Sequence, residues 1–267
     1  MNLFANLFTS SIGRKFLMAL TGIILTGFAF GHLVGNLQIF GSPDKINGYA
    51  YFLHSLGPAL WLVRIVLLAA VGVHVWAAVV LTLESKSARG PKDYGVHRWL
   101  AAAWASRYMR LSGLVVLAFI VYHILHFTVG LTDVQNFKTA LPVWVMTEDA
   151  RELGIPLVAK GTPVADVYSM IFIGFSHPLV AGFYILATAL LAVHLLHGME
   201  SMFQTLGLRN ATWSSGLRKV VGLLALVYFL GNLAIPGSII TGLLKPAEGT
   251  PAADYVSAKA VASAAAR

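Results

Sequence analysis

Four histidines in long apolar segments have the clearest potential for chemistry in this chain: His32, His74, His123 and His197. Each lies well inside a run of roughly 20 residues with almost no charged side chains, the length that a helix needs to cross a bilayer. Ionisable side chains are costly at such depth and are usually functional, and a neutral imidazole is a common metal ligand. Four histidines on four different spans therefore predict two metal centres, each with two histidine ligands.

The amino-acid composition indicates the class of protein in which these histidines lie. Of the 267 residues, 57% are hydrophobic and 11% are charged, and the mean hydropathy is +0.74. A soluble domain normally has about 25% charged residues, so the sequence predicts an integral membrane protein. The absence of cysteine excludes disulfides, iron–sulfur ligation by thiolates and covalent haem attachment. Any haem would therefore be held non-covalently, as a b-type haem.

Five segments are long and apolar enough to cross a membrane, at residues 16–40, 58–83, 110–132, 171–204 and 217–244. Residues 1–245 are expected to form one domain, with an outer loop at 133–170, and the alanine-rich residues 246–267 a flexible tail. The first span has glycines near every fourth position, at Gly22, Gly27, Gly31 and Gly35. They favour either close helix packing or room for a flat cofactor against the backbone. The predicted fold is all-α, with five transmembrane helices in a bundle that encloses two b-type haems.

The charged residues of the loops predict the orientation in the membrane. Basic residues cluster in the N-terminal segment and in two of the connections: Arg14, Lys15, Lys86, Arg89, Lys92, Arg98, Arg107, Arg110, Arg209, Arg218 and Lys219. The other face has mainly acidic residues: Asp44, Asp133, Glu148, Asp149, Glu152 and Asp166. Basic loops remain in the cytoplasm, so we expect a cytoplasmic N-terminus and a C-terminus outside. The formal net charge of +8 then lies on one membrane face, where it suits anionic lipid or an acidic partner better than nucleic acid.

This topology places the histidines at two depths. His32 and His123 each lie about eight residues before the outer end of their spans, which is roughly 12 Å below the outer boundary. His74 and His197 lie in the inner half. The spacing therefore predicts an outer haem on His32 and His123 and an inner haem on His74 and His197.

Neighbouring histidines leave the ligand assignment open. His126 and His194 each lie three residues from a proposed ligand, on nearly the same helix face, so either could replace it or contact a haem propionate or quinone. Arg64 could pair with a propionate or extend to the interface. Hydroxyls near the histidines are candidate hydrogen-bonding partners of the ligands, or they bond backbone carbonyls within their own helices, namely Ser112, Tyr122 and Thr128. The alternative function is a proton-coupled transporter whose histidines relay protons, although such proteins favour inverted repeats, which we do not find.

Several motifs resemble the cytochrome b558 family, the membrane-anchor subunits of succinate dehydrogenase and fumarate reductase. They are GHLVGN around His32, WLVRIVLLAAVGVHVWAAVVL around His74, SRYMRLSG leading to VYHILHFTVG around His123, and HLLHGMESMFQTLGL around His197. The resemblance covers roughly residues 10–245. It implies a single-chain, five-helix anchor with two haems b, in which His32 and His123 ligate the haem distal to the soluble subunits and His74 and His197 the proximal one.

The resemblance also implies partners and a reaction. The family anchor lies in the cytoplasmic membrane and binds an iron–sulfur subunit, which in turn binds a flavoprotein that interconverts succinate and fumarate. Electrons pass through the haems to or from a quinone, commonly menaquinone. The chain by itself should not oxidise succinate, since it has no dinucleotide fingerprint and no cysteine cluster. The cytochrome subunit of another quinol-linked complex is a further alternative.

The sequence departs from some di-haem relatives at the outer quinone site. Those relatives have a glutamate near the start of the second helix, whereas the corresponding stretch here, SPDKINGYAYFLHSLG, has none. Asp44, Tyr49 and His54 are the candidates to replace it; the alternative is that the quinone reacts at another place in the protein.

Overall fold

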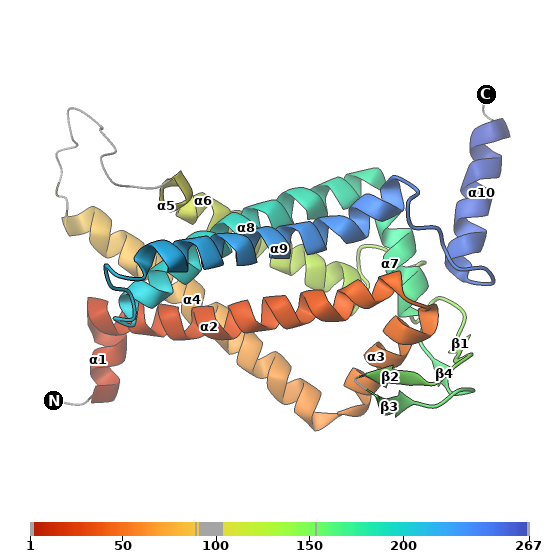
Figure 1. The fold of residues 1–267 in the computed structure, drawn as a ribbon, viewed down its shortest axis with the longest axis horizontal. Coiled ribbons are helices and arrows are strands. Elements are labelled where there is room, and N and C mark those ends of the chain that lie inside the picture. Colours follow the sequence, from red (N-terminus) through yellow and green to blue (C-terminus); the bar gives the residue numbers. More distant parts are fainter. Residues whose placement is uncertain (1–2, 89, 91–103, 153, 266–267) are drawn as a thin grey trace. The chain divides into compact units, whose positions relative to one another are not determined.

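Five helical segments are long and apolar enough to cross a membrane, which confirms this part of the sequence prediction and indicates a multi-pass membrane protein (Figure 1). The computed structural model describes residues 3–88, 90, 104–152 and 154–265, and it is 74% helical. The five segments are α2 (Ser11–Asn36) with the short helix η1 (Leu37–Phe40), α4 (Pro58–Ala88), α6 (Met109–His123) with the π-helix η2 (Ile124–Val129), α8 (Pro178–Thr205) and α9 (Ser214–Ile240). Arg89, Lys92 and Arg98, which entered the prediction of orientation, lie outside the described residues.

The predicted fourth span, at 171–204, is two helices in the structure. α7 (Val167–Phe175) ends at Ser176, and α8 begins at Pro178. Proline has no backbone N–H and disfavours helical geometry in the residue before it, which here is His177. Asp166 starts α7, because its side chain accepts a hydrogen bond from the Ser169 N–H at 2.9 Å.

The chain forms two compact units. The first unit comprises Met1–Phe30, Trp61–Gly113 and Ala192–Val227, and the second comprises Gly31–Leu60, Leu114–Leu191 and Tyr228–Arg267. Each unit contains part of every one of the five long helices, since the chain passes from one unit to the other within α2, α4, α6, α8 and α9.

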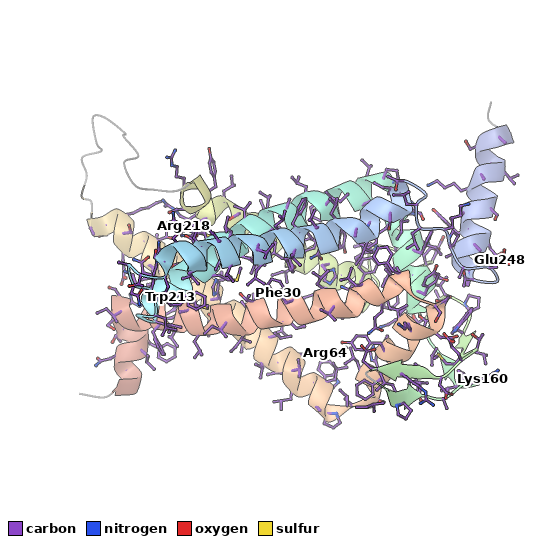
Figure 2. All side chains as sticks on the ribbon, viewed as in Figure 1. Phe30, Arg64, Lys160, Trp213, Arg218 and Glu248 are labelled. Atoms are coloured by element: carbon purple, nitrogen blue, oxygen red, sulfur yellow. The ribbon has the colours of Figure 1, made fainter. Side chains whose placement is uncertain are left out.

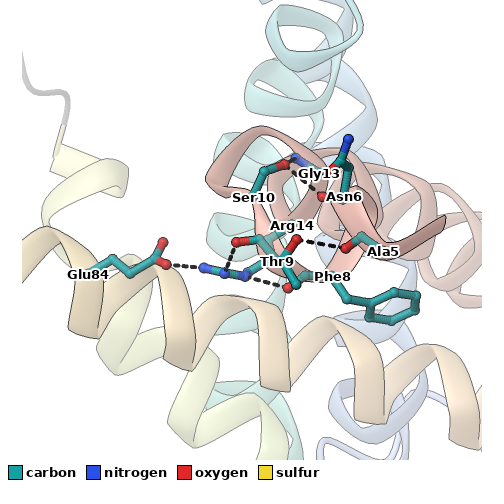
Figure 3. Close-up of polar contacts among 8 residues, drawn as sticks. All are labelled: Ala5, Asn6, Phe8, Thr9, Ser10, Gly13, Arg14 and Glu84. Atoms are coloured by element: carbon teal, nitrogen blue, oxygen red, sulfur yellow. Dashed lines mark hydrogen bonds and ion pairs between the residues drawn. The ribbon is translucent and has the colours of Figure 1, made fainter. Parts of the chain in front are cut away.

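In the first unit, Arg14 joins three helices (Figure 3). The side chain of Arg14 donates to the carbonyl oxygens of Phe8 and Thr9, at the end of α1 (Leu3–Thr9), and forms an ion pair with Glu84 of α4. Arg14 itself is in the first turn of α2 and is 8% exposed. Charge-assisted bonds with little exposure are the stronger kind, so this arginine fixes how α1 meets α2 and α4. The short helix α5 (Trp104–Arg107) also belongs to this unit.

The second unit has a small polar core beside its apolar one. α3 (Pro43–Ser55) packs against two short antiparallel pairs, β1 (Trp144–Val145) with β4 (Pro163–Val164) and β2 (Ala150–Glu152) with β3 (Ile155–Val158). Asp44 of α3 accepts hydrogen bonds from Trp144 Nε1 and from the N–H and hydroxyl of Thr147. These strands, within the predicted outer loop at 133–170, are an addition to the all-α prediction.

The predicted flexible tail at 246–267 contains a helix, α10 (Pro251–Ala265), which packs on α7. Tyr255 Oη lies 3.1 Å from His177 Nε2, and Lys259 Nζ donates to the Ser176 carbonyl at 2.9 Å. Alanine has the highest helix propensity, and a proline at the first helical position suits a helix start. The alanine-rich composition, from which the sequence predicts a flexible tail, is therefore also favourable for a helix.

Candidate metal centres

The second unit brings His32 of α2 next to His123 of α6. Their ring centroids lie 5.6 Å apart, and the ring planes make an angle of 82°. Two imidazoles that bind one metal atom from opposite sides have centroids about 6 Å apart, since each metal–nitrogen bond is about 2 Å. His32 is exposed, and no atom lies within 4 Å of a Cβ added at the adjacent Gly31. The pair thus has the separation of a two-histidine centre and an open side.

A tyrosine hydroxyl distinguishes His123 from His126. Tyr184 Oη of α8 lies 3.0 Å from His126 Nδ1 and 3.4 Å from His123 Nδ1. A hydroxyl has one proton to donate. The shorter contact favours donation to His126 Nδ1, in which case the hydroxyl accepts from the Nδ1–H of His123. This tautomer leaves the lone pair of His123 at Nε2, the other ring nitrogen.

His126 packs into protein instead of facing His32. It is buried, its ring stacks on Phe127 at 4.0 Å between centroids, and a Cβ added at Gly174 would lie 3.3 Å from its Nε2. Of the two histidines that the sequence left open, His123 is therefore the one beside His32.

The first unit brings His74 of α4 next to His194 of α8, with ring centroids 6.4 Å apart and ring planes at 58°. His197, which we predicted as the partner of His74, makes no ring contact with it within the described residues. Glycines make room for the two rings, because a Cβ added at Gly22 would lie 3.7 Å from His74 Cε1 and one at Gly113 3.4 Å from His194 Cε1. The geometry favours His194 as the partner.

Two hydroxyls fix the tautomers of this second pair. Thr21 Oγ1 donates to backbone carbonyls of its own helix, at 2.8 Å to Leu17 and 3.1 Å to Met18, and lies 3.0 Å from His74 Nδ1. Since its one proton goes to the backbone, Thr21 accepts from the Nδ1–H of His74. Ser112 Oγ repeats this arrangement, 3.0 Å from the Met109 carbonyl and 3.3 Å from His194 Nδ1.

These hydrogen bonds leave Nε2 of both His74 and His194 with a lone pair. Histidines that bind metals almost always donate the other ring N–H to a fixed acceptor, which orients the ring and sets its tautomer. The arrangement is therefore that of ligands prepared for a metal atom, and it adds to the case for His194 over His197.

No protein-family model, curated protein or solved structure matches the chain. The chemistry of the two pairs is accordingly argued from their own geometry. Groups of three or more His, Asp or Glu side chains that could hold a metal ion do not occur in the described part of the chain. The candidate centres are the two histidine pairs.

The other predicted polar residues have varied surroundings. Arg64 of α4 is labelled in Figure 2. It lies over the ring of Trp61, one turn away, at 4.9 Å from the centroid, which is a cation–π contact. Tyr122 has a ring contact with His126 at 5.5 Å, and Thr128 is exposed. Of the three hydroxyls named from the sequence, Ser112 is thus the one bonded to a histidine, whereas Thr21 and Tyr184 were not predicted.

The three residues predicted for the quinone site also differ in their surroundings. Asp44 is 2% exposed and occupied by its bonds to Trp144 and Thr147. His54 is exposed, with Lys138 Nζ 3.4 Å from its Nε2. Tyr49 packs on α2, since a Cβ added at Gly35 would lie 2.8 Å from its Cε1. Gly35 is three residues after His32, so Tyr49 is the candidate that lies within about one helical turn of a proposed ligand.

Proposed function

We propose that this chain is the membrane-anchor cytochrome b subunit of a succinate:quinone oxidoreductase. It would pass electrons between an iron–sulfur subunit and a membrane quinone, with menaquinone as the proposed species, through two haems b. The observation that supports this most strongly is the pair of histidines in each compact unit, at 5.6 and 6.4 Å between ring centroids. The motifs shared with the cytochrome b558 family connect this arrangement with succinate and quinone.

The residues present fit a haem better than a metal ion bound by protein alone. Each pair supplies two imidazoles and no carboxylate, and a porphyrin supplies the four remaining nitrogen ligands of a six-coordinate iron. Around His123 the neighbours are aromatic, with Phe119, Phe127 and Tyr184 all within 6 Å between centroids. Gly31 of α2, beside His32, has open space in place of a side chain. An apolar surface with an open glycine position suits a flat, apolar cofactor.

We assign the distal haem to His32 and His123, and the proximal haem to His74 and His194. The second assignment replaces the predicted His197, because His194 has both the ring contact with His74 and the bond to Ser112. When bound, the haems would supply one-electron chemistry. The protein's part is to hold the Nδ1 protons of His74, His123 and His194 on Thr21, Tyr184 and Ser112, so that each Nε2 keeps its lone pair.

Tyr49 is our candidate for contact with the quinone. Burial and the nearby carboxylate of Glu152 raise its pKa above the usual value, so the phenol keeps its proton and can donate a hydrogen bond to a quinone oxygen. Asp44 is excluded from this role because its oxygens already hold Trp144 and Thr147. The exposed His54 beside Lys138 remains a second candidate.

The positions of the basic residues support a proposed orientation of the chain in the membrane and a proposed face for binding the iron–sulfur subunit. Arg107 and Arg110 are exposed, in the stretch that leads into α6. We place these arginines on the cytoplasmic face of the inner membrane, in keeping with the positive-inside rule. There they would meet the iron–sulfur subunit, which in turn binds the flavoprotein.

The test is to count haem in the purified full-length chain and in single histidine-to-alanine variants. We expect two haems b per chain, and one after substitution of His32, His123, His74 or His194. The matched controls are His126 and His197, whose variants should keep both haems, with circular dichroism to verify folding. A colourless wild-type protein would contradict the proposal and favour the transporter.

Loss of haem in the His197 variant, with retention in that of His194, would restore the ligand predicted from the sequence. Co-purification with soluble subunits other than an iron–sulfur protein and a flavoprotein would point to a different quinol-linked complex.

A further inference from the structure

Two cavities of the first unit are lined by residues near the end of α8 and the start of α9. One is polar, with a volume of about 460 Å³, and its lining includes Gln204, Arg209 and Ser214. The other is apolar, about 310 Å³, and its lining includes Phe203 and Leu217. Phe203 precedes Gln204 in the chain, and Leu217 follows Ser214 by one helical turn. The residues that line the two cavities therefore occupy adjacent positions on the same two helices.

The apolar cavity is a groove that opens at the surface of the unit. Of the residues along it, Ile23 is 43% exposed, Val220 56% and Leu224 40%. All three belong to segments long and apolar enough to cross a membrane, so the open side of the groove would face lipid. Gly27 lies in the groove wall, and no atom is within 4 Å of a Cβ added there. The groove thus has room for an apolar chain that enters from the bilayer.

The polar cavity contains an arginine, Arg209, that has no acidic partner among the described residues. Arg209 Nε donates to Ser214 Oγ at 3.2 Å, and within the described residues this is the one hydrogen bond of its side chain. By contrast, Arg218 on α9 pairs with Glu200 at 3.5 Å. The bond to Ser214 holds the guanidinium in place and leaves its two terminal nitrogens for a ligand. Two parallel N–H groups match a phosphate.

A tryptophan next to the lining residues is typical of the head-group level of a membrane. Trp213 lies just before α9, packs edge-on against Phe203 at 6.1 Å between centroids, and is 39% exposed. Figure 2 labels Trp213 and Arg218 at this end of α9. Tryptophan is enriched at the boundary between hydrocarbon and head groups, so we expect Arg209, four residues before Trp213, near the level of lipid phosphates.

We propose that the two cavities bind one anionic glycerophospholipid, with its phosphate on Arg209 and an acyl chain in the groove. The positive charge of Arg209 and the neighbouring positions of the polar and apolar linings support this occupant over a neutral lipid. Basic pockets between membrane helices are known to hold such head groups. The site is separate from the histidine pairs and does not depend on the presence of haem.

The test is native mass spectrometry of the full chain as purified in detergent, with dioleoyl phosphatidylglycerol and dioleoyl phosphatidylcholine added at equal concentration. The wild type should retain one phosphatidylglycerol in preference to phosphatidylcholine. Arg209→Gln should reduce this preference about tenfold, since it removes a charge-assisted hydrogen bond, and Arg209→Lys should reduce it less. The matched control is Lys219→Gln, an exposed basic residue of α9 that does not line either cavity. Val220→Phe should weaken the retention of both lipids, because it narrows the mouth of the groove.

Three results would overturn the proposal. An equal loss of phosphatidylglycerol in Arg209→Gln and Lys219→Gln would mean a general attraction of charge. Inorganic phosphate that competes with the lipid at equal concentration, with no effect of Val220→Phe, would mean a simple anion site. Retention of a quinone in place of phosphatidylglycerol would assign the groove to a different ligand. Melting followed by circular dichroism verifies that each variant is folded before these comparisons are made.

Discussion

Replacement of Thr21 by valine tests whether its hydroxyl prepares His74 as a ligand. Valine has nearly the shape of threonine but has no oxygen, so the Nδ1–H of His74 loses the acceptor that now lies 3.0 Å away. The backbone loses little, because the Leu17 and Met18 carbonyls that the hydroxyl also contacts belong to the helix itself. The change thus removes one specific bond to the histidine.

The magnitude follows from burial and from the role of the bond. Thr21 is 7% exposed, so water has little access to replace the lost acceptor. A buried donor left unsatisfied costs about 1–3 kcal/mol. The ring can avoid part of this cost without haem by moving its proton to Nε2, but that tautomer has no lone pair for iron at Nε2. We therefore expect the loss mainly in haem affinity, about 10- to 100-fold, as is typical when the partner of a metal-binding histidine is removed.

The assay is haem transfer from the purified chain to an excess of a soluble haem acceptor, followed by absorbance in the reduced state. Thr188→Val is the matched control. Thr188 is 5% exposed, its hydroxyl bonds the carbonyls of Tyr184 and Ile185 at 2.8 and 3.2 Å, and within the described residues it contacts no histidine. Thr21→Val should release one haem faster, and Thr188→Val should behave as the wild type. Equal release from both variants would refute the role that we give to Thr21.

Three further predictions concern polar contacts. Tyr184→Phe should weaken binding of the distal haem about tenfold in the same transfer assay, whereas Tyr122→Phe should not, since Tyr122 contacts His126 through its ring alone among the described residues. A double-mutant cycle of Arg14→Gln and Glu84→Gln should give a coupling energy of about 1–2 kcal/mol in the free energy of unfolding. This is below the value for a fully buried pair, because the Glu84 side chain is 41% exposed. A coupling energy of zero would mean that the ion pair adds no stability. Asp44→Asn should lower the free energy of unfolding of the second unit by about 2 kcal/mol, measured by a thermal melt, and an unchanged melt would show that its bonds to β1 are dispensable.

The five spans were predictable because length and apolar composition are local properties of a segment. All five predicted ranges overlap helices of the structure. The break between α7 and α8 had a local signal in Pro178, which the long apolar run around it concealed. The strand pairs had no such signal, since strands of two to four residues show no usable periodicity. They depend on contacts such as that of Asp44 with Trp144, which is 100 residues away in the chain.

Spacing placed the histidines in candidate pairs but left alternatives that only packing distinguishes. His123 and His126 share a face in an ideal α-helix, yet the π-helix η2 begins at Ile124, directly after His123. A π-helix has more residues per turn, so the rings of His123 and His126 point differently. One faces His32 and the other packs on Phe127. The choice between His194 and His197 likewise depends on packing, because His194 is the one whose ring contacts His74 of α4.

The acceptors of the histidine protons were the least predictable part of the site. Ser112 was among the predicted hydroxyls, but the sequence does not show which helices are neighbours, so it gave no reason to single out Thr21 or Tyr184. Both bonds join different helices, Thr21 of α2 with His74 of α4 and Tyr184 of α8 with His123 of α6. The spacing of residues along one helix cannot predict a hydrogen bond between a hydroxyl and a histidine on two different helices.

The dependence of each proposed ligand on a second helix links the fold to the chemistry. His74, His123 and His194 each have their Nδ1 bonded to a hydroxyl from a different helix. The correct tautomer of each histidine is then present only where its two helices pack correctly, so a ring able to bind iron is itself a product of folding. Because the two histidine pairs lie in separate compact units, each centre has its own set of such contacts. Loss of one centre should therefore leave the other intact, a property expected of two independent haems and not of a single chain of proton-relaying histidines.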